Sequence, residues 1–135
     1  MSYGRCGYTD DDDNGSFAMW RGQVASAIRG KRGQAFLRDL IAALDAMPEK
    51  ELIAHELRKD GAVCALGCLG AARGVALEDI DPEDHETLSE TFNIAHQLVQ
   101  EVEWVNDESG GYWKTDTPAK RWQRVRDWAA QNLKG

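Results

Sequence analysis

The segment QAFLRDLIAALDAM, residues 34–47, does most to limit the folds open to this chain. Its apolar side chains recur every three or four residues, which is the spacing of one broad stripe along an α-helix. The stripe consists of Phe36, Leu37, Leu40, Ile41, Leu44 and Met47. The pattern predicts an amphipathic helix with one face in a core.

A second amphipathic helix is predicted from Ser16 to Arg29, ahead of the first. Ser16 is the expected N-cap of this helix. Its apolar residues again follow spacings of three and four: Phe17, Trp20, Val24 and Ile28. The sequence GKRG, residues 30–33, predicts a break between the two helices, because two glycines so close together mark a turn.

The sequence PEKELIAHELRK, residues 48–59, predicts a third helix. Proline suits the first turn of a helix, and the Asp60–Gly61 pair is a typical ending. This helix would bury Leu52, Ile53 and Leu57. The next segment, residues 62–74, also predicts a helix, because Gly74 follows it as a C′ glycine would. A strand over AVCAL is the alternative there.

An acidic helical region is predicted over residues 83–106. Its apolar residues repeat at intervals of four and three: Leu88, Phe92, Ala95, Val99 and Val102. Asn93 is able to cap a new helix, so one long helix and two short helices both fit the pattern. A last helix is predicted to begin at Thr117 and Pro118 and to run to Leu133. Its inward residues would be Trp122, Val125 and Ala129, with Trp128 on the flank.

Together these segments predict an all-α protein of about five to seven helices. A chain of 135 residues, 42% of them hydrophobic, fits one domain with a real core. We expect this helical domain over residues 16–135, preceded by a flexible acidic segment over residues 1–15.

Composition also indicates the cellular compartment. No apolar run approaches the roughly 20 residues that cross a bilayer, and the first residues, MSYGRCGYTDDDD, are acidic where a signal peptide is apolar. Three cysteines are an odd number and suit a reducing compartment better than a disulfide framework. We therefore expect a cytoplasmic protein with no membrane partner.

The sequence DDDDNG, residues 10–15, resembles the start of a calcium-binding EF-hand loop. Asp10, Asp12 and Asn14 alternate before Gly15, as the oxygen ligands of such a loop do. The twelfth position should be a bidentate glutamate, and it is Arg21. We expect no calcium site, and we expect the aspartates to favour the positive end of the following helix.

Zinc binding has equally weak support. Cys64 and Cys68 would share one face of a helix, and Cys6 with one of the histidines would complete four ligands. Nothing in the sequence fixes the fourth ligand, and a free cysteine in an apolar helix is an ordinary small core residue. The expectation is no metal and no cofactor.

Motifs for catalysis are missing as well. The sequence holds no G-x-S-x-G elbow, no H-E-x-x-H helix and no Walker A loop. A histidine beside a glutamate on a helix, such as His55 and Glu56, is more often incidental than catalytic. A non-enzymatic protein is the expectation, and a deep pocket around His55, His85 or His96 would favour an enzyme instead.

Charge is distributed unevenly along the chain. Eleven acidic residues and no Lys or Arg lie between Glu78 and Glu108, whereas residues 21–38 hold five basic residues and no acid. Such segments either form separate charged surfaces or neutralise one another in the fold. Tyr112 and Trp113 lie in a polar loop between these acidic and C-terminal segments, and Trp113 is the tryptophan least expected in the core.

The chain resembles a group of small, functionally uncharacterised proteins encoded by tailed bacteriophages and prophages of proteobacteria. The stretches that carry the resemblance are SAIRGKRGQAFLR, CALGCLGAARG, VNDE and TPAKRWQRVRDW, in that order between Trp20 and Trp128. The resemblance implies expression inside an infected bacterium among accessory genes. It carries over no catalytic residue.

These observations favour a phage accessory protein that binds a host or phage macromolecule. Its sharpest form is an inhibitor of an anti-phage defence system, such as a CRISPR complex, because an acidic helix is able to compete with nucleic acid for a basic groove. The residues expected to form this acidic face are Glu83, Asp84, Glu86, Glu90, Glu101, Asp107 and Glu108.

The alternative function is a nucleic-acid-binding phage regulator. It would contact phosphates through the basic turn at Arg29, Lys31 and Arg32 and through the arginine-rich last helix. An enzyme with an unrecognised site is a third interpretation.

Overall fold

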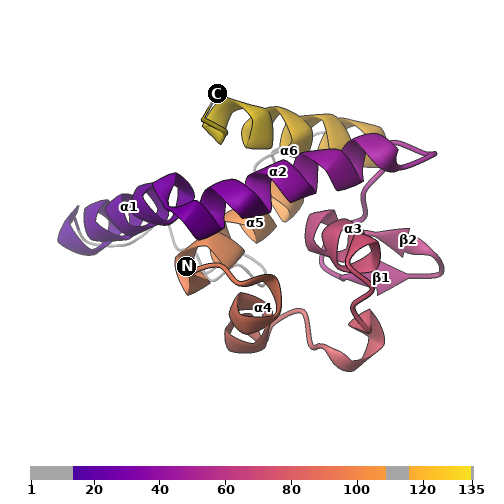
Figure 1. Cartoon of the computed structure of the whole chain (residues 1–135), viewed down its shortest axis with the longest axis horizontal. Coiled ribbons are helices and arrows are strands. Elements are labelled where there is room, and N and C mark those ends of the chain that lie inside the picture. Colours follow the sequence, from indigo (N-terminus) through magenta and orange to yellow (C-terminus); the bar gives the residue numbers. More distant parts are fainter. Residues whose placement is uncertain (1–13, 109–115, 135) are drawn as a thin grey trace.

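The computed structural model describes residues 14–108 and 116–134, and within them it contains six α-helices and one short hairpin (Figure 1). The elements are α1 (Asn14–Arg29), α2 (Lys31–Ala46), β1 (Arg58–Lys59), β2 (Ala62–Val63), α3 (Ala65–Ala72), the 3₁₀ turn η2 (Leu77–Asp79), α4 (His85–Phe92), α5 (His96–Asp107) and α6 (Pro118–Asn132). The predicted all-α class with five to seven helices is confirmed. None of the described helices is long and apolar enough to cross a membrane.

Helix α2 lies at the centre of the fold and packs against α1, α3 and α6, while α5 packs against α1, α3, α4 and α6 (Figure 1). The predicted stripe of α2 forms much of the core, since Phe36, Leu37, Leu40 and Leu44 are all buried. Ile41 and Met47 are half-buried at its margin.

The break between α1 and α2 is much shorter than GKRG predicted. Only Gly30 interrupts the helices, and Lys31, Arg32 and Gly33 already belong to the first turn of α2. A Cβ on Gly33 would lie 2.0 Å from the carbonyl oxygen of Ala27, so only glycine lets α2 approach the end of α1 so closely.

The start of α1 also differs from the prediction. The helix begins at Asn14, so Ser16 lies within it and is not its N-cap. The remaining acidic residues of the N-terminal segment, including Asp10 and Asp12, lie outside the described residues.

The helix predicted over residues 48–59 is wrong. The chain after α2 runs as irregular backbone into β1, and Asp60 and Gly61 form a tight hairpin turn with φ of 52° and 85°. The amides of this segment find partners outside it: Leu52 N donates to the carbonyl of Pro118 and Ile53 N to that of Val63. The expected burial of Leu52 and Leu57 nevertheless holds. The apolar spacing therefore predicted which side chains are buried, but it did not predict the backbone conformation of residues 48–59.

Helix α3 confirms the helical reading of residues 62–74, and the alternative strand is limited to Ala62–Val63. Cys64 caps the helix, because its Sγ accepts a hydrogen bond from Gly67 N. Gly74 follows the C-cap with φ of 75°, as expected of a C′ glycine.

The acidic region contains two helices, α4 and α5, which resolves the choice left open by the sequence. Asn93 has φ of 55° and ends α4, so it caps the finished helix and does not start a new one. Buried Ile94 then leads into α5. The last helix is confirmed: the Thr117 hydroxyl accepts from Lys120 N, Pro118 is the first helical residue, and Trp122, Val125 and Ala129 are buried.

Candidate functional site

The predicted acidic face is divided by the fold into exposed and buried carboxylates. Glu83, Asp84, Glu86 and Glu90 are exposed on α4 and the residues before it. Glu101 is only 3% exposed, and the side chain of Asp107 is wholly inaccessible. Glu108 is half-buried. The expected residues therefore do not share one surface, and Glu101 and Asp107 are excluded from it.

Buried Glu101 is an internal ion-pair partner. Arg21 of α1 donates to its Oε1 at 2.6 Å and to its Oε2 at 3.3 Å, in the forked geometry that suits a carboxylate. The pair joins α1 to α5. The position that fails as a calcium ligand in the sequence thus holds a structural arginine.

The exposed carboxylates of α4 have few internal partners. Asp84 caps the helix through Thr87, whose amide and hydroxyl donate to it, and these hydrogen bonds lower the pKa of Asp84. We use the name acidic surface for three carboxylates without a side-chain hydrogen bond or ion pair among the described residues: Glu83, Glu86 and Glu90. Glu86 and Glu90 are four residues apart along one side of α4, and Glu83 lies in the turn just before the helix.

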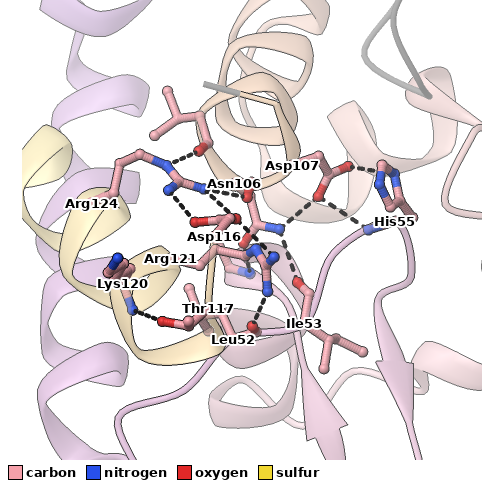
Figure 2. Close-up of polar contacts among 12 residues, drawn as sticks. Leu52, Ile53, His55, Asn106, Asp107, Asp116, Thr117, Lys120, Arg121 and Arg124 are labelled. Atoms are coloured by element: carbon pink, nitrogen blue, oxygen red, sulfur yellow. Dashed lines mark hydrogen bonds and ion pairs between the residues drawn. The ribbon is translucent and has the colours of Figure 1, made fainter. Parts of the chain in front are cut away.

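A polar network, the corner network, lies where the end of α5 meets the start of α6 (Figure 2). Arg121 and Arg124 each donate to Asp116 at 2.8 Å. The hydrogen bond from Arg124, with the charges of both arginines, holds the pKa of Asp116 below its ordinary value. Arg121 also donates to the carbonyl of Leu52 at 2.6 Å, which ties the loop after α2 to this corner.

Arg124 has a further role at the end of α5. It donates to the main-chain carbonyls of Val105 and Asn106 at 2.8 and 3.0 Å. These carbonyls lie in the last turn, where a helix lacks internal donors and favours a cation. The arginines of α6, including Arg126 in its ion pair with Asp45, are therefore engaged within the fold. The alternative hypothesis needs them free to bind phosphates, so this part of it loses support.

Asn106 and Asp107 form the centre of the corner network (Figure 2). The Asn106 amide accepts from Ala65 N at 3.0 Å and donates to the carbonyl of Ile53 at 2.9 Å. Asp107 accepts from His55 N at 3.1 Å, and its other oxygen lies 3.6 Å from His55 Nδ1. His55 has φ of 69°, a strained conformation for a non-glycine residue, which this carboxylate helps to hold.

The other two histidines are the first residues of α4 and α5, His85 and His96. His85 Nε2 is 2.7 Å from Oε1 of Glu103, a carboxylate with no accessible surface, and the ring of His96 packs edge-on against His85 at 5.4 Å. A histidine–carboxylate pair is the usual core of a general base, but a base must reach its substrate. The His85 side chain is only 11% exposed, so the pair joins α4 to α5 without presenting an open reactive nitrogen.

Two of the hollows on the surface of the described residues bear on the enzyme hypothesis. One lies between the hairpin and η2 and is lined by Leu57, Arg58, Lys59, Asp60, Leu77, Glu78 and Ile80. The other lies between α5 and α6 and is lined by Trp104, Val105, Lys120, Gln123, Arg124, Asp127, Trp128 and Gln131. No histidine lines either hollow, so neither provides the pocket that would favour an enzyme.

The structure also bears on the metal hypotheses within residues 14–108 and 116–134. Cys64 and Cys68 are both buried, and no group of three His, Cys, Asp or Glu side chains there is placed to hold a metal ion. Cys6 and the loop aromatics Tyr112 and Trp113 lie outside the described residues. Of the remaining tryptophans, Trp122 is buried and Trp20, Trp104 and Trp128 pack against the core.

Sequence reasoning missed the corner network. The only signal was the polar run VNDE at the end of a predicted helix. Nothing in the sequence shows that Asn106 contacts Ala65 and Ile53, which lie 41 and 53 positions before it in the chain. The fold and these sites define a small all-α protein whose polar networks stabilise its architecture. No protein-family model, curated protein or solved structure matches the chain.

Proposed function

We propose that the protein acts by binding a basic macromolecular partner through the acidic surface, Glu83, Glu86 and Glu90. The observation that carries the proposal is the lack of internal countercharge. Two other acids of the acidic segment have such a countercharge: Glu78 pairs with Arg58 and Glu101 with Arg21. Like charges four residues apart on a helix destabilise it by a few tenths of a kcal/mol. Glu90 beside Glu86 therefore does not help the helix, whereas Glu86 in the first turn favours its positive end.

A basic partner would supply the missing countercharge. Exposed charges of one sign steer association and select partners of opposite charge. A protein groove that normally holds nucleic acid has the required chemistry, since it is built to neutralise rows of phosphates. The sharpest form of the proposal is therefore an inhibitor that occupies such a groove in a bacterial anti-phage defence complex, acting in the cytoplasm of the infected host.

The test is a pull-down of the tagged protein from phage-infected cells, read by mass spectrometry. The wild-type chain should recover a basic, nucleic-acid-binding complex, and salt should release it. The variant Glu83→Gln/Glu86→Gln/Glu90→Gln keeps side-chain size and should recover about tenfold less or lower, because each lost charge pair weakens association.

The matched control is Glu49→Gln/Glu51→Gln/Glu56→Gln, which removes as much charge from the exposed loop after α2. It should recover the partner as the wild type does. Equal recovery by both variants and the wild type would remove the acidic surface from the proposal. Recovery of nucleic acid alone, or of nothing, would contradict the inhibitor.

A further inference from the structure

Four cations without an internal ion-pair partner lie close together in sequence, at the α1–α2 junction and in the first two turns of α2. Every arginine outside residues 29–38 in the described part of the chain forms an ion pair: Arg21, Arg58, Arg73, Arg121, Arg124 and Arg126. By contrast, the side chains of Arg29, Lys31 and Arg38 are exposed and form no hydrogen bond or ion pair with described residues. Arg32 is exposed too, and its only such contact is a 3.4 Å hydrogen bond to the neutral amide of Asn93.

We infer that these residues form a second binding surface, the basic corner, which contacts the phosphates of a nucleic-acid duplex. The basic corner comprises Arg29, Lys31, Arg32 and Arg38. It is a different surface from the acidic one, on α1 and α2 instead of α4, and the inference does not rest on the proposed function.

The geometry of α2 supports a row of phosphate contacts. Lys31 and Arg38 are seven residues apart, which places them on the same face with about 10 Å between them along the helix axis. One strand of a duplex advances about 3.4 Å per phosphate, so that length spans about three phosphates. The acid nearest in sequence, Asp39, is held in an ion pair with Arg73 at 2.8 Å and does not neutralise Arg38.

Nucleic acid suits this surface better than an acidic protein segment does. Three of the cations are arginines, whose planar fork matches two oxygens of one phosphate. The side chains lie at the end of α1 and on the first two turns of α2, and they line neither of the two hollows described above. An all-electrostatic contact of this kind is sequence-independent, with affinity set by the number of phosphates neutralised.

The test is the binding of the full chain to a short fluorescein-labelled DNA duplex, followed by anisotropy between about 50 and about 200 mM salt. We expect a Kd of roughly 10⁻⁴–10⁻⁶ M and a slope of log K against log salt of about −3 to −4, as for four phosphate contacts. Lys31→Ala and Arg38→Ala touch no described partner and should each reduce the magnitude of the slope by about 1.

The combined variant Arg29→Ala/Lys31→Ala/Arg32→Ala/Arg38→Ala should bind about tenfold more weakly or worse. Its control, Arg58→Ala/Lys59→Ala/Arg126→Ala/Lys134→Ala, removes the same amount of charge elsewhere and should keep affinity within about threefold. Circular dichroism checks that both variants fold. If either does not, the single variants Lys31→Ala and Arg38→Ala test the inference in its place.

Several results would overturn the inference. The first is that the wild type does not bind the duplex at about 50 mM salt. The second is that the combined variant binds as tightly as the wild type. The third is that the control variant loses as much affinity as the combined variant, which would show that binding depends on net charge alone. Equal competition by poly-glutamate at the same charge concentration would assign the surface to an acidic protein. The variant Glu83→Gln/Glu86→Gln/Glu90→Gln should bind the duplex as well as the wild type does. The experiments therefore test the basic corner and the acidic surface independently of each other.

Discussion

At the scale of single residues, Asn106 stabilises the fold through one wholly buried amide. It satisfies the amide of Ala65 and the carbonyl of Ile53, which belong to different parts of the chain. Asn106→Ala leaves both groups without that partner, and an unmet buried group costs about 1–3 kcal/mol. We expect a loss of about 3 kcal/mol in the free energy of unfolding, measured by urea denaturation.

The matched control for this variant is Gln123→Ala. Its amide is also hydrogen-bonded, to Asp127, but it is exposed on α6. We expect a change within about 0.5 kcal/mol, as for most surface substitutions. Similar losses from the two substitutions would show that the buried amide has no special role.

Cys64 and Cys68 should be unreactive in the native protein. Burial, with the nearby Cys64, raises the pKa of Cys68 to about 11. The reactive species is the thiolate, which is scarce at neutral pH when the pKa is high. A Cys6→Ser variant treated with a thiol-specific chromogenic reagent should show no rapid reaction until urea unfolds it. Rapid native labelling of Cys68 would contradict the buried position.

At the scale of elements, two helical glycines should respond to alanine in opposite ways. Gly33→Ala would force a Cβ to 2.0 Å from the carbonyl of Ala27, so α1 and α2 must separate. Gly22 in α1 has open space around its Cβ position, and alanine there should stabilise by about 0.5–1 kcal/mol. We expect Gly33→Ala to destabilise by about 2 kcal/mol or more in thermal or urea unfolding.

The pair is its own control, because both substitutions add one methyl group to a helix. A Gly33→Ala protein as stable as Gly22→Ala would show that the α1–α2 junction adjusts freely. The same junction explains why GKRG misled the prediction. Glycine there permits close helix packing, whereas sequence patterns associate it with turns.

Elements were predictable where their own residues settle the backbone, and not where distant partners do. The apolar stripe of α2 and the Thr117–Pro118 start of α6 are local signals, and both gave the right helices. Residues 48–59 have the same apolar spacing, but Leu52 and Ile53 donate their amides to Pro118 and Val63. Tertiary hydrogen bonds thus overrode helix propensity, which a single sequence does not reveal.

At the scale of the whole molecule, folding pairs some of the opposite charges and leaves others exposed without an ion-pair partner. The sequence allowed separate charged surfaces or mutual neutralisation, and the structure contains both. Arg21 crosses to Glu101 and Arg126 to Asp45, more than 75 residues away in each case. The acidic surface and the basic corner remain. Which charges would pair was unpredictable, because the pairing depends on contacts between helices far apart in the chain.

The corner network makes a pH-dependent contribution to the stability of the whole domain. The pKa of Asp116 is lowered in the folded state, chiefly by its hydrogen bond from Arg124. A group with a depressed folded pKa stabilises the fold above its unfolded pKa of about 3.9, and this contribution is lost as pH falls through the folded pKa. Acid should therefore release the junction of α5, α6 and the loop at Leu52 together.

Asp116→Asn tests this contribution. Asp116 is only 17% exposed and holds two arginines, so the variant should be about 2 kcal/mol less stable than the wild type at pH 7. The difference should shrink as pH falls below about 4 toward the lowered folded pKa, because the wild-type carboxylate then binds a proton more readily in the unfolded state than in the folded state. The exposed Asp127→Asn on the same helix should change stability by less than about 0.5 kcal/mol at either pH. Urea unfolding from pH 7 to pH 3 measures the stability of all three proteins. A difference between Asp116→Asn and the wild type that is undiminished at pH 3 would show that the charge of Asp116 does not stabilise the corner network.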